Sequence, residues 1–130
     1  MPLKWTISHE ERLVTATGEG FVPLEEIEEY YDALIVNNAL SYGRLFDCSR
    51  LDDKSATDEE FMRLGARMRA YVAEDFKFGP MAYVITSPAV LAILRRNLNL
   101  APADRPVKVF STVERARRWL DQQRLALAPL

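Results

Sequence analysis

The side chains best suited to chemistry lie in one stretch, RLFDCSRLDDKSATDEEF, residues 44–61. Asp47 offers a carboxylate, Cys48 a thiol and Ser49 a hydroxyl, at the end of an apolar run that predicts a buried strand over 42–48. A carboxylate there is costly unless it is hydrogen-bonded. We therefore expect Asp47 either to hold the following loop through backbone amides or to serve a ligand or partner.

These groups do not form a catalytic constellation. Cys48 has no histidine near it in the sequence, and the single histidine, His9, falls in a predicted hairpin turn. A nucleophilic cysteine needs a neighbour that stabilises its thiolate, and a nitrogen–sulfur metal site needs more ligands than one histidine and one cysteine. Residues 18–20 lack the further glycines of a phosphate-binding loop. We expect a protein that is not an enzyme and uses no metal or cofactor.

Two further polar strand ends suggest an anion-binding or ligand-binding rim. Thr86 and Ser87 end one predicted strand, and Ser111 follows another. Ligands in open α/β sheets lie beyond the carboxyl ends of the strands, and helix amino termini attract anions. The alternative is that Thr57, Ser87 and Ser111 are N-caps, each worth about 1 kcal/mol to its own helix, which explains their placement without a ligand.

The elements that must position these residues follow from hydrophobic periodicity. Alternating residues predict an opening hairpin, and three units of an apolar strand and a helix come after the first helix. The predicted order is strands at 3–8 and 12–20, a helix from 23, a strand at 42–48, a helix from 57, a strand at 81–86, a helix from 88, a strand at 107–110 and a helix from 111. Apolar strands separated by helices indicate a mixed α/β sheet of about five strands, covered by four helices on both faces.

Length and composition indicate one domain. A chain of 130 residues buries enough surface for a core of its own, and we expect a single domain over 1–130 with its core at 3–123 and an apolar tail at 124–130. One cysteine allows no internal disulfide and fits a reducing compartment. Neither a signal peptide nor a transmembrane segment is recognisable, so we expect a cytoplasmic protein.

The net charge of −2 hides an asymmetry between the two halves. Residues 1–61 hold 14 acidic and 5 basic residues, a net charge of −9, whereas residues 62–130 hold 5 acidic and 12 basic residues, a net charge of +7. The basic residues form no stripe interleaved with aromatic residues, so we expect no nucleic-acid partner. The asymmetry is compatible with a homodimer, or with two halves that neutralise each other within one chain.

Two phrases resemble the STAS-like superfamily, and within it the SpoIIAA-like branch of small bacterial proteins. GRLFDCSRL is similar to that branch's strand ending in an aspartate, and VKVFSTVERARRWL to its closing strand and helix. The resemblance spans about residues 3–123. It implies a non-enzymatic regulatory or interaction module that binds a protein partner. In the anti-sigma-factor antagonists a loop serine is phosphorylated; the nearby hydroxyls here are Ser49, Ser55 and Thr57, none of which stands in the family's motif.

Three hypotheses follow. The first is an interaction module that docks a partner through Asp47 to Phe61 and a second copy through an interface containing Phe76 and Phe78. The second, which the resemblance also suggests, is a carrier or sensor of a small lipid-like or anionic ligand. An apolar cavity near Phe76, Phe78 or Tyr83 would favour it. The third, an enzyme using Asp47 or Cys48, requires a cleft and a strongly shifted pKa.

Overall fold

The computed structural model describes residues 2–52, 58–73, 78–98 and 106–127. The elements alternate as the periodicity predicts, and their order confirms the α/β class with a mixed sheet. They are β1 (Leu3–Ser8), β2 (Leu13–Gly20), α1 (Leu24–Val36), β3 (Gly43–Leu51), α2 (Asp58–Ala73), β4 (Met81–Val84), α3 (Pro88–Leu98), β5 (Val107–Phe110) and α4 (Val113–Leu127).

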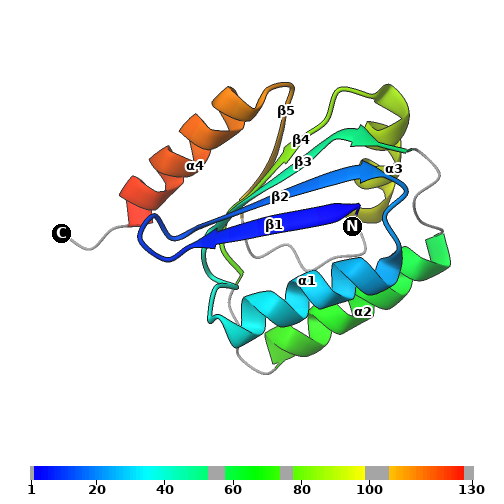
Figure 1. The fold of residues 1–130 in the computed structure, drawn as a ribbon, viewed down its shortest axis with the longest axis horizontal. Helices are drawn as coiled ribbons and strands as arrows, with labels where there is room; N and C mark the ends of the chain where they lie inside the picture. Colours follow the sequence, from blue (N-terminus) through cyan, green and yellow to red (C-terminus); the bar gives the residue numbers. More distant parts are fainter. Residues whose placement is uncertain (1, 53–57, 74–77, 99–105, 128–130) are drawn as a thin grey trace.

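The sheet has five strands in sequence order, β1-β2-β3-β4-β5 (Figure 1). The opening hairpin makes β1 and β2 antiparallel, whereas β2, β3, β4 and β5 run parallel to one another. Parallel neighbours need a crossover, and α1, α2 and α3 supply the three crossovers. The carboxyl ends of β2 to β5 therefore lie at one edge of the sheet.

Helices cover both faces, although unequally. Helix α4 contacts β3, β4 and β5 on one face, where Leu45, Ala82 and Leu120 form a buried cluster. Helices α1, α2 and α3 lie on the other side of the sheet (Figure 1). We call that side the pocket face. Its inward positions alternate with those of the α4 face, as the pleat of a strand requires.

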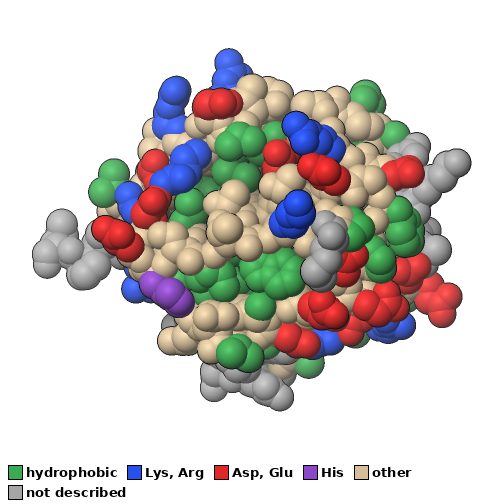
Figure 2. Space-filling view, in the orientation of Figure 1, with side chains coloured by type: hydrophobic (Ala, Val, Ile, Leu, Met, Phe, Trp, Pro, Cys, Tyr) green, Lys and Arg blue, Asp and Glu red, His purple; other side chains and the backbone are tan. Residues whose placement is uncertain are grey.

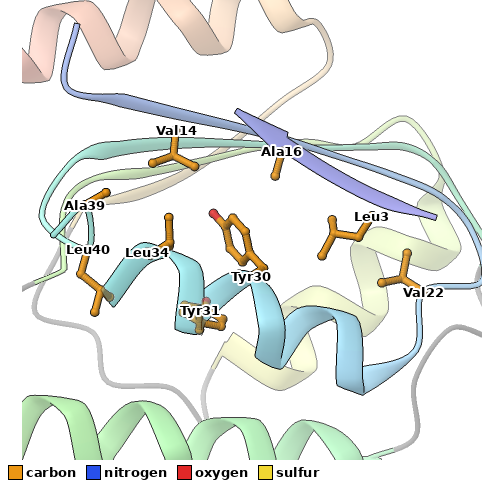
Figure 3. Packing of buried hydrophobic residues seen from close by; sticks show 9 residues of the cluster. All are labelled: Leu3, Val14, Ala16, Val22, Tyr30, Tyr31, Leu34, Ala39 and Leu40. Atoms are coloured by element: carbon orange, nitrogen blue, oxygen red, sulfur yellow. The ribbon is translucent and has the colours of Figure 1, made fainter. Parts of the chain in front are cut away.

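Aromatic residues dominate the core between α1 and the sheet (Figure 3). The Tyr30 ring rises from α1 toward Val14 and Ala16 of β2. It meets Trp5 and Phe46 edge-on, with ring centroids 5.6 and 6.0 Å apart. Such edge-to-face pairs stabilise by about 0.5–1.5 kcal/mol beyond the area they bury, and they fix how α1 sits on the sheet.

Helix α4 differs from its prediction at both ends. Its N-cap is Thr112 rather than Ser111, because the Thr112 Oγ1 atom accepts a hydrogen bond from the Arg115 amide at 3.2 Å. The helix continues to Leu127, so most of the predicted apolar tail is helical. Within that segment Leu125 is exposed. The described part of the segment therefore extends the helix rather than forming a separate tail.

The two charge-asymmetric halves neutralise each other within the chain. Glu28 of α1 binds Arg63 and Arg67 of α2 at 2.9 and 2.6 Å, and Glu11 of the hairpin turn pairs with Arg117 of α4. Figure 2 shows acidic side chains gathered at the lower right, with basic side chains beside them. Each of these pairs joins an acidic residue of the first half to a basic residue of the second. The asymmetry therefore needs no second chain to balance it.

Among the described residues, no helix combines the length and apolar character needed to cross a membrane.

Candidate functional site

The chemistry-bearing residues of β3 lie within a strand, not in a loop. The prediction ended the strand at Cys48, but β3 continues to Leu51. Asp47 is paired with both β2 and β4, whereas Ser49 falls in the register shift between Asp47 and Arg50. The register shifts at this point, since Thr17 pairs with Asp47 and Glu19 with Arg50, so β3 has one extra residue before the two strands resume pairing. Asp47 and Ser49 therefore lie in a strand and not in the predicted loop, and their role toward a partner stays a prediction. Ser55 and Thr57, the other members of that loop, lie outside the described residues.

Asp47 serves its own strand. Its Oδ1 atom accepts a hydrogen bond from the Ser49 amide at 3.0 Å, which is the structural alternative considered for this carboxylate. In the sheet, Asp47 stands opposite Thr17 of β2 and Val84 of β4. It has the same orientation as Leu45, two residues earlier, and so faces the α4 side.

Cys48 points to the pocket face and is buried. Burial raises the pKa of its thiol to about 12, and the neighbouring charge of Asp47 adds to the increase. The thiol is therefore protonated at neutral pH and is not a nucleophile. In the parts of the chain that the structure describes, no three histidine, cysteine or acidic side chains are grouped to hold a metal ion.

The candidate anion rim consists of helix caps and exposed side chains. Ser87 caps α3, with its Oγ atom 3.4 Å from the Val90 amide. Thr86 and Ser111 are exposed, and Thr112 takes the capping role predicted for Ser111. These contacts match the capping alternative.

The candidate interface at Phe76 and Phe78 can be followed only in part. Phe76 lies outside the described residues, whereas Phe78 is half-buried and packs against the core cluster under α1. Its ring centroid lies 5.7 Å from the Cζ atom of Arg44. Phe78 therefore packs against the core of this chain.

An apolar pocket of about 130 Å³ lies on the pocket face, between the sheet and the helices. Tyr83 of β4 is one of its lining residues, which is the position where a cavity was expected for a carrier. Inward positions of β3 and β4 form its floor, and α1, α2 and α3 contribute its walls. Representative lining residues are Phe46, Cys48, Tyr83, Tyr31, Leu64 and Leu94.

Arg44, which the sequence analysis did not single out, is buried beside this pocket. Its exposed fraction is 0%, and it is two residues from Phe46 on the same face of β3. Its partner in the register of the sheet is Met81, a pocket residue, and its Cζ atom lies 5.1 Å from the ring centroid of Tyr31, another pocket residue. The sequence feature that could have identified Arg44 is an arginine at an inward position of a strand that is otherwise apolar.

Aromatic rings surround the Arg44 guanidinium. Besides Tyr31 and Phe78, the Tyr30 ring centroid lies 6.0 Å from its Cζ atom. Burial works to lower the pKa of Arg44, but electrostatic interactions, first with Tyr31 and then with Tyr30, outweigh it and raise that pKa above its ordinary value. The side chain therefore carries its positive charge. None of its three guanidinium nitrogens makes a hydrogen bond of normal geometry to the described residues.

A second, larger pocket of about 350 Å³ lies at the opposite edge of the sheet, beside the hairpin turn. Its charged groups are engaged with neighbours. Arg124 donates to the Glu11 carbonyl at 3.1 Å and pairs with Asp121 at 3.8 Å, and Arg12 lies over the Tyr42 ring at 5.3 Å. This pocket is therefore a groove in which apolar surface is bordered by charged residues that interact with one another.

Comparison with solved structures identifies the architecture. A crystal structure of an uncharacterized DUF3478-family protein from Shewanella loihica, described as having a SpoIIAA-like fold, superposes on the chain with a TM-score of 0.60. The match covers 91% of this chain and 93% of the other, at 18% sequence identity. The fold is SpoIIAA-like. This confirms the fold that the resemblance implied, and at this identity the likeness extends to the fold alone.

No family model matches the chain, and no curated protein matches it. The function of this SpoIIAA-like domain must therefore be argued from its own pocket and side chains.

Proposed function

We propose that this SpoIIAA-like domain is a non-catalytic binding module that carries or senses a small lipid-like ligand in the pocket between its sheet and helices α1 to α3. The pocket itself is the observation that supports the proposal. Its volume of about 130 Å³ is close to that of an engineered apolar protein cavity, about 150 Å³, which binds benzene. A ligand of about six carbons is therefore of suitable size.

The chemistry around the pocket supports binding rather than catalysis. Cys48, the nucleophilic residue type in the lining, has a protonated thiol. The walls are otherwise mostly aliphatic and aromatic, and such side chains bind apolar groups by excluding water. A site of this kind selects a ligand by shape and by whatever charged group lies next to it.

A second candidate is an interaction module that docks a protein partner or a second copy of the chain. Its support is the SpoIIAA-like fold and a few exposed large apolar side chains, among them Phe21, Val36 and Met62. Single exposed apolar residues are common on protein surfaces, and the charge asymmetry is already balanced within the chain. We therefore rank docking below ligand binding.

The test is to fill the pocket and measure binding of 1-hexanol. Val90→Phe introduces a large ring in the pocket wall, and Val36→Phe makes the same change at an exposed helix position as the matched control. At ten times its Kd, hexanol should stabilise the wild type and V36F by about 1.4 kcal/mol. For a domain of this size, that corresponds to an increase of roughly 3–6 °C in Tm.

V90F should show less than a third of that increase in Tm, because the added ring occupies the binding volume. Equal increases in all three proteins would place hexanol elsewhere and contradict the proposal. So would the absence of any increase in the wild type.

A further inference from the structure

Arg44 holds a buried positive charge whose hydrogen-bonding capacity is largely unused by the described residues. A guanidinium has five N–H donors in a planar fork. The rings of Tyr30, Tyr31 and Phe78 compensate its charge through cation–π contacts. Tyr31 also interacts with the guanidinium through its side chain, but none of the three nitrogens makes a hydrogen bond of normal geometry to the described residues, so most of the donors are unused. Buried donors without acceptors are costly, so this arrangement is poised to accept an anion.

The position of Arg44 relative to the pocket indicates how such an anion would arrive. Arg44 and the pocket share Tyr31, and Met81 lines the pocket while standing opposite Arg44 in the sheet. Phe46, next inward on the same strand, belongs to the pocket floor. An alkyl chain lying along this floor would have one end near Met81 and the Tyr31 ring, and both of these residues are also neighbours of Arg44.

We infer that the pocket ligand is an amphiphilic monocarboxylate with a short alkyl chain, and that Arg44 binds its carboxylate while the apolar pocket holds the chain. This inference rests on the proposed function, because it names the class of ligand for the same pocket. A carboxylate matches the guanidinium fork with two parallel hydrogen bonds, which neutral head groups cannot do. Tyr31 lines the pocket and also lies over the guanidinium, so it stands at the junction of the chain-binding and carboxylate-binding parts of the site.

The experiment compares hexanoate with 1-hexanol by isothermal titration calorimetry. The two probes share a six-carbon chain and differ in the head group. In the wild type, hexanoate should bind at least tenfold more tightly than hexanol. Arg44→Met keeps a side chain of similar length without the charge, and should remove this preference while hexanol binding stays within twofold of the wild type.

Arg12→Met is the matched control. Arg12 also lies over a tyrosine ring and lines a pocket, but the pocket is the one at the opposite edge of the sheet. R12M should keep the wild-type preference for hexanoate. Loss of the preference in R12M rather than R44M would assign the carboxylate to the other pocket and overturn the inference.

The outcomes separate the inference from the proposed function. If hexanol binds and hexanoate binds no more tightly, the role of Arg44 is wrong and the apolar carrier stands. If neither probe binds the wild type, or if V90F binds both probes as tightly as the wild type does, both fail. Should R44M not fold, NMR titration of carboxyl-labelled hexanoate on the wild type decides. The pKa of the bound carboxyl must fall below that of free hexanoate, and an unchanged or raised pKa overturns the inference.

Discussion

At the scale of single residues, the pocket face combines a buried arginine, which is rare in an apolar strand, with a buried thiol, which is common there. Arg44 and Cys48 occupy inward positions of the same strand, four residues apart. The arginine keeps its charge and the thiol keeps its proton. The pocket is therefore mostly apolar, with the charged Arg44 beside it and Asp52 as the ionisable carboxyl group among its lining residues.

The raised pKa of Cys48 predicts how stability depends on pH. The unfolded thiol ionises at its ordinary pKa of about 8.5, whereas the folded thiol holds its proton up to a pKa of about 12. Above pH 9 the unfolded state therefore binds fewer protons than the folded state, and the free energy of unfolding falls as the pH rises. By pH 10 the loss from this group is about 2 kcal/mol, on the scale of 1.36 kcal/mol per pKa unit.

Urea unfolding of the wild type and Cys48→Ala at pH 8, 9 and 10 checks this dependence. Tyrosine and lysine groups titrate in both proteins, so the difference between the two pH slopes isolates the thiol. C48A should lose stability less steeply than the wild type. Parallel slopes would mean that the thiol is not held protonated by burial.

At the scale of elements, capping explains the polar residues that follow the strands. Thr112 hydrogen-bonds the Arg115 amide, whereas Ser111 is exposed and has no capping contact in the described structure. Thr112→Ala should lower the free energy of unfolding by about 1 kcal/mol, and Ser111→Ala should change it by less than about 0.3 kcal/mol. Chemical denaturation of the two variants provides the measurement, and an equal or reversed pair of effects would restore Ser111 as the cap.

The sequence predicted the kind and order of the elements because hydrophobic periodicity is local. It did not predict the length of β3, because the residues beyond Cys48 pair, after a register shift, with the end of β2, about thirty residues earlier in the chain. It could not choose between Ser111 and Thr112, because both are good caps and lie one residue apart. Arg44 was missed for a similar reason: the rings that enclose it come from α1 and from Phe78, far away in the chain.

At the scale of the whole molecule, ion pairs join an acidic first half to a basic second half. The pairs between α1 and α2 connect two helices on the pocket face, so they also hold that side of the pocket together. The sequence analysis left open whether the asymmetry is balanced within one chain or between two. In the structure, acidic residues of the first half form ion pairs with basic residues of the second half of the same chain. These pairs depend on the packing of segments that are distant in the sequence, so the sequence alone could not show them.

The ion pairs between α1 and α2 allow a last prediction, which concerns their contribution to stability. Glu28 is 27% exposed and pairs with both Arg63 and Arg67, whereas Glu19 is 59% exposed and pairs only with Arg50 among the described ion pairs. Partly buried, bidentate pairs stabilise more than exposed single ones, which are worth about 0–1 kcal/mol. Glu28→Gln should lower the free energy of unfolding by about 1 kcal/mol at low salt, and Glu19→Gln by less than half as much.

Salt provides the decisive comparison. In 1 M NaCl the Debye length falls to about 3 Å, so the effect of E28Q should shrink if it arises from charge. Thermal unfolding of both variants at 0.05 and 1 M NaCl measures this. A destabilisation by E28Q that does not change with salt would mean that Glu28 acts through packing, and that α1 and α2 are held together by their apolar contacts rather than by the opposite charges of the two halves.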